Sequence, residues 1–317
     1  AIGILCLVFR ERAKAGRKPF SVVSCDNLRE NGRKLERAVR TYLTKLSGDG
    51  WDEALDFVLS DVSFPCSMVD RIVPELTSEV KLDIELASGV SHPELLATEE
   101  FTQWVIEDRF VGGRPSWERV FVDFVRDIKP FEEMKLRMLN ATHSLLAYLG
   151  VLRGYEFVHQ AVADPAINDL ARALLLEEVS PLLEKYHRKD RLAEYAERLL
   201  ARFANEKLPH RLQQIAADGS VKISQRILPS ISESLKESTL RSSLITALAS
   251  WICFLHKRIS AGQPLQDPKS TKLTALFEKD LEAFARKLVA EKDLFGDLTG
   301  NALITNELTA RVLSLKA

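Results

Sequence analysis

Three polar side chains on one apolar stretch are the residues of this sequence best suited to acid–base chemistry. The stretch runs from Pro130 to Tyr148. Its apolar residues recur at helical spacing behind a proline and two acidic residues, which favour a helix start. At about 100° per residue, Asn140 and His143 lie about 60° apart around such a helix, and Lys135 lies about 80° from His143. A buried Lys, an Asn and a His so placed can exchange a proton with a ligand and hydrogen-bond it, as alcohol–ketone interconversion requires.

The same three residues also have a purely structural interpretation. A Lys on a helix usually extends to water, an Asn is usually a surface residue, and a His on an apolar face is usually a satisfied core residue. Spacing alone therefore leaves both interpretations open.

Several sequence blocks resemble those of the polyol-specific long-chain dehydrogenases, the mannitol dehydrogenase family, and most closely its fructuronate reductase branch. The catalytic helix of that family carries a K-x4-N-x2-H pattern, which Lys135, Asn140 and His143 match position by position. Four more blocks follow in the family's order and span most of the chain: SCDNLRENG at 24–32, SFPCSMVDRIVP at 63–74, FTQWVIEDRFVGGRPSWE at 101–118 and DGSVK at 218–222.

This resemblance implies a zinc-independent hydride transfer in which Lys135 exchanges the proton. Lys135 would be an acid in reduction and a neutral base in oxidation, so burial is expected to lower its pKa below the usual value of about 10.4. Asn31 and Asn140 would donate hydrogen bonds to the substrate oxygen, and His143 would orient the substrate. Glu132 would relay the proton to water, unless it is simply a helix-start carboxylate. Asn31, followed by Gly, is equally explained as part of a turn.

The resemblance also implies a cofactor, which would be NAD. It places Asn27, Val69 and Asp70 at the cofactor, although Asp70 beside Arg71 is otherwise explained as a surface ion pair. NADP stays open because the residues that read the ribose in this family lie upstream of the present sequence. The glycines of Gly112–Gly113 precede Arg-Pro and indicate a turn rather than a phosphate cradle.

The segment around residues 205–222 covers the far end of the substrate in the resembled family. Gln214 stands where mannitol-type members tend to have an Arg, and the surrounding pattern resembles the fructuronate type. A forked guanidinium at Arg211, with His210 and Lys222 beside it, would suit a sugar-acid carboxylate, although a loop Arg is usually solvated. We therefore predict interconversion of D-fructuronate and D-mannonate. A mannitol or other polyol dehydrogenase and a non-catalytic remnant are the alternatives.

The expected fold class is α/β plus all-α. Residues 1–129 are predicted to be the remainder of a Rossmann-type nucleotide-binding domain, and 130–317 an α-helical substrate domain. Within the first part we expect a helix ending at Gly16, a strand over 20–25, a helix over 33–45, a short strand within 63–74 and a strand-containing excursion at 75–98. The helices expected after Pro130 are 131–155, 166–186, 190–204, 239–259, 270–291 and 303–315.

The composition excludes some classes of partner but does not indicate a function. The formal net charge of −1 gives no reason to expect nucleic acid or a membrane surface as partner, and no apolar run has the ~20 residues of a membrane span. The histidines and cysteines lack zinc-ligand spacing, and a cytoplasmic enzyme acting on a small molecule is the prediction. Because the sequence starts at Ala1 without a Met, we expect a piece of a longer protein that alone does not hold a dinucleotide.

Overall fold

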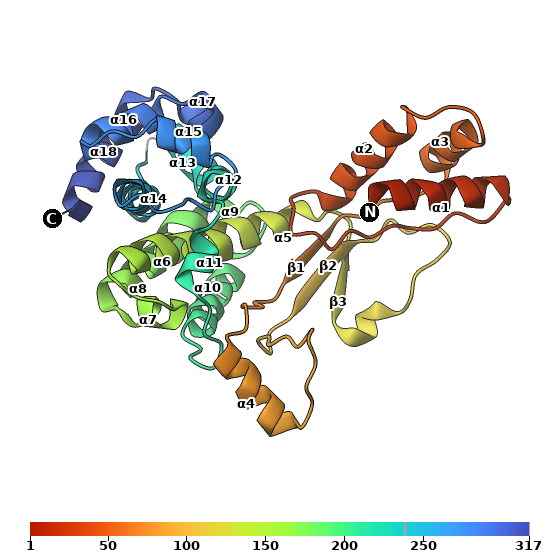
Figure 1. The fold of residues 1–317 in the computed structure, drawn as a ribbon, viewed down its shortest axis with the longest axis horizontal. Coiled ribbons are helices and arrows are strands. Elements are labelled where there is room, and N and C mark those ends of the chain that lie inside the picture. The colour runs from red at the N-terminus through yellow and green to blue at the C-terminus, as the bar shows by residue number, and fades with distance from the viewer. Residues whose placement is uncertain (238, 317) are drawn as a thin grey trace. The chain divides into compact units, whose positions relative to one another are not determined.

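The contacts of the chain divide it into two compact units (Figure 1). The computed structural model describes residues 1–237 and 239–316. Unit 1 comprises Ala1–Ile72 and Glu100–Glu132, and unit 2 comprises Val73–Glu99 and Glu133–Ala317. The predicted fold class, a Rossmann-type portion followed by a mainly helical domain, is confirmed.

Unit 1 combines helices with a small mixed sheet. Its elements are α1 (Ile2–Lys14), α2 (Asn31–Leu43), α3 (Trp51–Ser60), β1 (Ser67–Asp70), β2 (Gln103–Glu107), the 3-10 helix η1 (Trp117–Val120), β3 (Val122–Val125) and most of α5 (Lys129–Met134). Strand β2 lies between an antiparallel β1 and a parallel β3. Helices α1, α2 and α3 enclose an apolar core that includes Phe9, Val39 and Val58.

Most of the elements predicted for unit 1 are present. Helices α1 and α2 and strand β1 confirm the expected helices and the short strand. The strand predicted over residues 20–25 is wrong. A strand requires a ladder of backbone hydrogen bonds, whereas this segment forms an isolated bridge between Ser21 and Ser63 among the described residues.

Unit 2 is helical. Its elements are α4 (Ser78–Ser88), the π-helix η2 (Lys135–Asn140), α6 (Ala141–Leu152), α7 (Val158–Ala163), α8 (Pro165–Arg172), the π-helix η3 (Ala173–Val179), α9 (Ser180–Leu183), α10 (Lys189–Phe203), α11 (Leu212–Ala216), α12 (Gly219–Arg226), α13 (Leu228–Lys236), α14 (Ser242–Ser260), α15 (Ser270–Ala275), α16 (Leu281–Val289), α17 (Lys292–Phe295), the 3-10 helix η4 (Gly296–Leu298) and α18 (Ala302–Lys316). Helix α14 is buried along most of its length and packs against α6 and α18.

Two predictions for unit 2 are wrong. The excursion at 75–98 contains helix α4 and no strand, because the Thr77 side chain accepts a hydrogen bond from the Val80 N–H and caps its start. The helix predicted over 270–291 is two helices, since Asp280 starts α16 by accepting from the Ala283 N–H at 2.8 Å. Helices α7, α11, α12 and α13 were not predicted, and α12 matters for the site.

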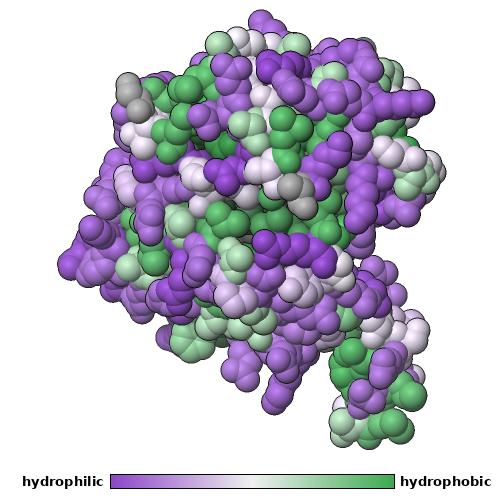
Figure 2. All heavy atoms as spheres, turned by 90° about the vertical axis from the view of Figure 1, so that its left-hand side faces the viewer, coloured by the Kyte–Doolittle hydropathy of each residue, from purple (hydrophilic) through white to green (hydrophobic). Residues whose placement is uncertain are grey.

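Helix α4 and the loop after it carry apolar side chains on their surface. Leu82, Leu86 and Leu96 are exposed, and the lowest lobe in Figure 2, at the height of α4 in Figure 1, carries apolar side chains on its surface.

In the part of the chain that the structure describes, no helix has both the length and the apolar character needed to cross a lipid bilayer.

Candidate active site

The stretch with the predicted catalytic residues is not a uniform α-helix. It begins as α5, becomes the π-helix η2 from Lys135 to Asn140, and continues as α6, which carries His143. In an α-helix, five residues turn through about 500°, so Lys135 and Asn140 would project about 140° apart. The wider π-helix has about 4.4 residues per turn, which brings the two side chains to within about 50° of each other. The π-helix therefore places the predicted base and the predicted donor on one side.

All three residues of the pattern are buried. Lys135 is 8% exposed, and Asn140 and His143 are each 6% exposed. The His143 ring lies 4.6 Å from the Phe203 ring and 5.5 Å from the His210 ring, measured between centroids. Burial, helped by His210 and nearby Arg side chains, lowers the pKa of His143 well below its usual value, so its imidazole is neutral.

Two imidazole nitrogens at this place have no partner. The Nε2 atom of His143 and the Nδ1 atom of His210 are buried and make no hydrogen bond to any described residue. Burial lowers the pKa of His210 to about 4, with the charge of Lys222 as a further cause, so His210 is neutral as well. Buried polar atoms without a partner are uncommon in folded proteins, and two at one place indicate a ligand or water there.

Basic side chains from α12 lie close to these histidines. Burial lowers the pKa of Lys222 to about 8 and that of Arg226 to about 10, and the charge of Arg226 further lowers the pKa of Lys222. The Lys222 ammonium donates to the Ile215 carbonyl at 3.1 Å. Neither Lys222 nor Arg226 forms an ion pair with a carboxylate of residues 1–237 or 239–316. This part of unit 2 therefore carries positive charge that suits an anionic ligand.

Arg226 is not among the site residues predicted from the sequence, because its place beside Lys222 depends on helix α12. Lys222 and Arg226 are four residues apart, so they share a helix face once 219–226 is known to be helical. The sequence of residues 205–222 predicts a basic loop and a helix start, but it does not predict that the helix continues to Arg226.

Arg211, which is predicted to bind a substrate carboxylate, has partners within the protein. Its guanidinium forms an ion pair with Glu156 and lies over the Phe157 ring, 5.3 Å from the ring centroid. The Arg211 side chain is 43% exposed, and Glu156 partly satisfies the fork that was assigned to a substrate carboxylate. Gln214 accepts a hydrogen bond from the Glu75 N–H at 3.3 Å.

Asn31, which is predicted to donate a hydrogen bond to the substrate oxygen, is hydrogen-bonded within the protein. Its side-chain amide donates to the Ser24, Asp26 and Ser67 carbonyl oxygens at 2.9 to 3.0 Å. Its Oδ1 atom accepts from the N–H groups of Gly32 and Ser67. Two amide hydrogens therefore face three acceptors within the protein, and the bond to a substrate oxygen stays a prediction. Asn31 ties the 24–31 loop to strand β1.

Glu132 has the features of a group that can exchange protons. Its Oε1 atom accepts from the Glu30 N–H at 2.8 Å, whereas its buried Oε2 atom has no partner among the described residues. Burial raises the pKa of the Glu132 carboxyl. Lys135 follows it by three residues in the chain, on the continuation of the same helical stretch.

The residues assigned to the cofactor lie in unit 1. Val69 and Asp70 form the end of β1, where Val69 is 37% exposed and Asp70 is 2% exposed, so Asp70 is a buried residue rather than a surface one. Asn27 lies in the exposed loop before α2. Nucleotides bind at the carboxyl ends of strands in Rossmann-type sheets, and the assignment of these residues to the cofactor stays a prediction. The pattern G-x-G-x-x-G does not occur in the sequence.

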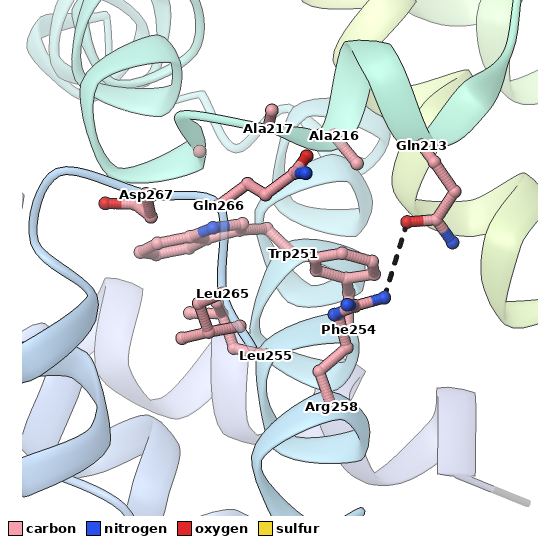
Figure 3. A pocket seen from close by; sticks show the side chains of 11 residues that line it. Gln213, Ala216, Ala217, Trp251, Phe254, Leu255, Arg258, Leu265, Gln266 and Asp267 are labelled. Carbon is pink, nitrogen blue, oxygen red and sulfur yellow. Dashed lines mark hydrogen bonds between the residues drawn. The ribbon is translucent and has the colours of Figure 1, made fainter. Parts of the chain in front are cut away.

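The turn before α12 is held by a distant segment. Asp267 accepts from the Ser220 N–H at 2.8 Å and from its hydroxyl at 2.5 Å, and the Asp218 N–H donates to the Gln266 carbonyl at 2.7 Å. Figure 3 shows Gln266 and Asp267 beside the Trp251 indole, at a cavity of about 30 Å³, which is room for about one water. These contacts fix the start of the helix that presents Lys222.

Gly219 in this turn has no room for a side chain. A Cβ atom there would lie 2.5 Å from Trp251 Nε1 and 2.7 Å from the Tyr148 hydroxyl oxygen. We expect Gly219→Ala to lower the free energy of unfolding by about 1–3 kcal/mol, as overpacking does, measured by urea denaturation of the full-length protein. Gly3→Ala is the control: its Cβ would be 3.5 Å from the nearest atom, so stability should be unchanged or slightly higher. A Gly219→Ala protein as stable as the parent would contradict this packing argument.

Among the residues that the structure describes, no group of three or more His, Cys, Asp or Glu side chains is arranged to hold a metal ion.

Comparison with known proteins identifies the domain families that match this chain and proteins that are similar to it. A model of the mannitol dehydrogenase Rossmann domain matches residues 1–119, and a model of the mannitol dehydrogenase C-terminal domain matches residues 127–316. D-mannonate oxidoreductase of Escherichia coli is 44% identical over 257 residues, which cover 80% of this chain and 51% of that protein. Mannitol 2-dehydrogenase of Phaeosphaeria nodorum is 37% identical over 291 residues, covering 90% of this chain and 50% of that protein.

Solved structures agree. Pseudomonas fluorescens mannitol 2-dehydrogenase, in a ternary complex with NAD and D-mannitol, superposes with a TM-score of 0.87 and 31% sequence identity. The match covers 100% of this chain and 64% of that one. The chain thus spans 50 to 65% of the length of these curated relatives and of two further oxidoreductases of Escherichia coli.

Proposed function

Because this chain belongs to the mannitol dehydrogenase family, we propose that it is the substrate-handling part of an NAD-dependent oxidoreductase acting on a hexuronate. The proposed reaction interconverts a keto-hexuronate and an aldonate, the D-fructuronate and D-mannonate pair. Of the two relatives compared above, one is a D-mannonate oxidoreductase and the other a mannitol 2-dehydrogenase, and the choice between these substrates rests on this chain's own residues.

One observation carries the choice of an anionic substrate. Lys222 and Arg226 bring positive charge beside His143 and His210, and they form no ion pair with a carboxylate of the described residues. The carboxylates of Asp218 and Asp267 act on Lys222 without forming an ion pair with it, so its charge is only partly compensated, and a substrate carboxylate would complete the compensation. A polyol is neutral and offers no such compensation. The proposed carboxylate site is therefore centred on Lys222 and His210, with Arg226 adding charge and Arg211 at its exposed side.

Nicotinamide chemistry supplies the hydride transfer when NAD is bound. Val69, Asp70 and Asn27 are the residues of this chain that we assign to the nicotinamide end of the cofactor, which the place of Val69 and Asp70 at the end of β1 and of Asn27 in the exposed loop before α2 supports.

The remaining roles belong to residues of the helical stretch that runs from α5 through η2 into α6. Lys135 gives its proton to the substrate oxygen as the carbonyl is reduced, and takes it back in oxidation. Asn140, on the same side of η2, donates to that oxygen, and His143 uses its unpartnered Nε2 to orient a substrate hydroxyl. Glu132, whose pKa burial raises, returns the proton of Lys135 to water.

The test is a steady-state assay of the natural full-length protein with NADH as reductant. We expect kcat/KM for D-fructuronate to exceed that for D-fructose by at least about tenfold, the effect of one charge-assisted hydrogen bond. A preference for D-fructose would overturn the hexuronate assignment and favour a mannitol dehydrogenase.

The mannitol 2-dehydrogenase alternative is supported by the close superposition on the mannitol complex. The non-catalytic alternative predicts turnover of neither substrate, with NADH or NADPH. The same assay therefore separates all three functions.

A further inference from the structure

The Asn140 carbonyl lies where the helix changes from π to α. η2 ends at Asn140 and α6 begins at Ala141. A π-helix pairs each carbonyl with the N–H five residues on and an α-helix with the N–H four residues on, so the bonding pattern changes at this junction. The Asn140 carbonyl accepts two additional hydrogen bonds here, from the Ser144 hydroxyl at 3.2 Å and from Arg226 Nη1 at 3.3 Å.

Arg226 reaches this carbonyl from another helix. It is the last residue of α12, which contacts both η2 and α6. The same Nη1 atom donates to the Ser144 hydroxyl oxygen at 3.3 Å, so Arg226, Ser144 and the Asn140 carbonyl form a closed triangle. Burial lowers the pKa of Arg226 to about 10, which still leaves it protonated near neutral pH. A charged group kept partly buried without a carboxylate partner needs another reason to be there, and the junction supplies one.

We propose that Arg226 is a positioning residue for the reaction: by holding the Asn140 carbonyl it keeps η2 in its π form, with Lys135 and Asn140 on one side. This inference rests on the proposed function, because it assigns Arg226 to the same site. Long π-helices are rare because their hydrogen-bonding geometry is unfavourable, so external contacts have to select them. Without Arg226, residues 135–140 rewind towards an α-helix, which separates Lys135 and Asn140 by about 140°.

The experiment compares Arg226→Met with Arg226→Lys in the natural full-length enzyme. Arg226→Met should lower kcat about 100-fold, as a displacement of about 1 Å at reacting groups does, while KM for D-fructose, which has no carboxylate to lose, changes by less than about threefold. Arg226→Lys keeps a donor for the Asn140 carbonyl and should recover about tenfold of the loss.

Arg241→Met is the matched control. Arg241 Nη1 donates at 3.1 Å to the Glu177 carbonyl in the other π-helix, η3, so the variant removes a similar bond where no reaction is assigned. It should lower the melting temperature while kcat stays within about twofold of the parent. Should Arg226→Met not fold, Ser144→Ala removes the other side-chain donor to the Asn140 carbonyl and should lower kcat about tenfold.

A crystal structure of the Arg226→Met protein gives a readout that does not depend on turnover. We expect residues 135–140 to be α-helical in it. An unchanged π-helix, an unchanged kcat, or an equal loss of kcat in Arg241→Met would each overturn the proposal. If the parent turns over neither D-fructuronate nor D-fructose, the proposed function fails, and the conformation of 135–140 still decides whether Arg226 holds the π-helix.

Discussion

Replacing Lys135 by alanine in the full-length enzyme should lower kcat for D-fructuronate reduction by about 10³-fold or more. Lys135 is 8% exposed and begins the π-helix that brings it beside Asn140. The proposed reaction requires a proton to reach the substrate oxygen as the hydride arrives, and Lys135 is the residue to which we assign that proton. KM should change much less than kcat, since the lost interaction belongs mainly to the transition state.

Two comparisons separate this effect from a loss of folding. Lys129→Ala removes an exposed Lys at the start of α5, six residues before Lys135, and should leave kcat unchanged. Small primary amines added to Lys135→Ala should restore part of the activity, because they supply the missing acid in the vacated space. A Lys135→Ala enzyme with a kcat within about threefold of the parent would exclude Lys135 as the acid.

Lys222→Met should raise KM for D-fructuronate by about 10- to 100-fold, because a hydrogen bond to a charged group contributes about 1.5–3 kcal/mol. Its KM for D-fructose should change by less than about threefold, since the uncharged sugar has no carboxylate to lose. Arg211→Ala should raise KM for D-fructuronate less than Lys222→Met does, because Glu156 already pairs with that guanidinium. Equal effects of Lys222→Met on both sugars would contradict a carboxylate site at Lys222.

The same residue predicts a dependence on pH. Burial and Arg226 lower the pKa of Lys222 to about 8, and a carboxylate binds the protonated form. Affinity for D-fructuronate should therefore be full below pH 8 and fall as the pH rises through about 8, and Lys222→Met should remove this fall. Lys207→Met, which changes an exposed Lys in the segment before His210, should keep the parent profile. KM measured from pH 6 to 10 checks the fall in the parent and its absence in Lys222→Met. This range spans the lowered pKa of about 8 and stays below the usual Lys pKa of about 10.4.

Spacing along the sequence could indicate the roles of some predicted site residues, but not those of others. Lys135, Asn140 and His143 lie within nine residues on one helical stretch, so local geometry relates them. Asn31 and Arg211 were assigned by resemblance, and the structure gives each of them partners inside the protein. Sequence does not reveal such partners, because Ser67 and Glu156 are distant along the chain.

Taken alone, the sequence determined the family, the fold class and the three-residue pattern, because these follow from residue types, their order and short-range periodicity. Only the tertiary structure decided that 135–140 is a π-helix, that α12 brings Arg226 to the Asn140 carbonyl, and that Asp267 holds the turn before Lys222. The same local sequence can form an α-helix or a π-helix, so contacts from elsewhere in the chain select between them. Arg226, which contacts this stretch, lies 86 positions from Asn140 and 82 positions from Ser144 along the chain, and only folding brings these residues together.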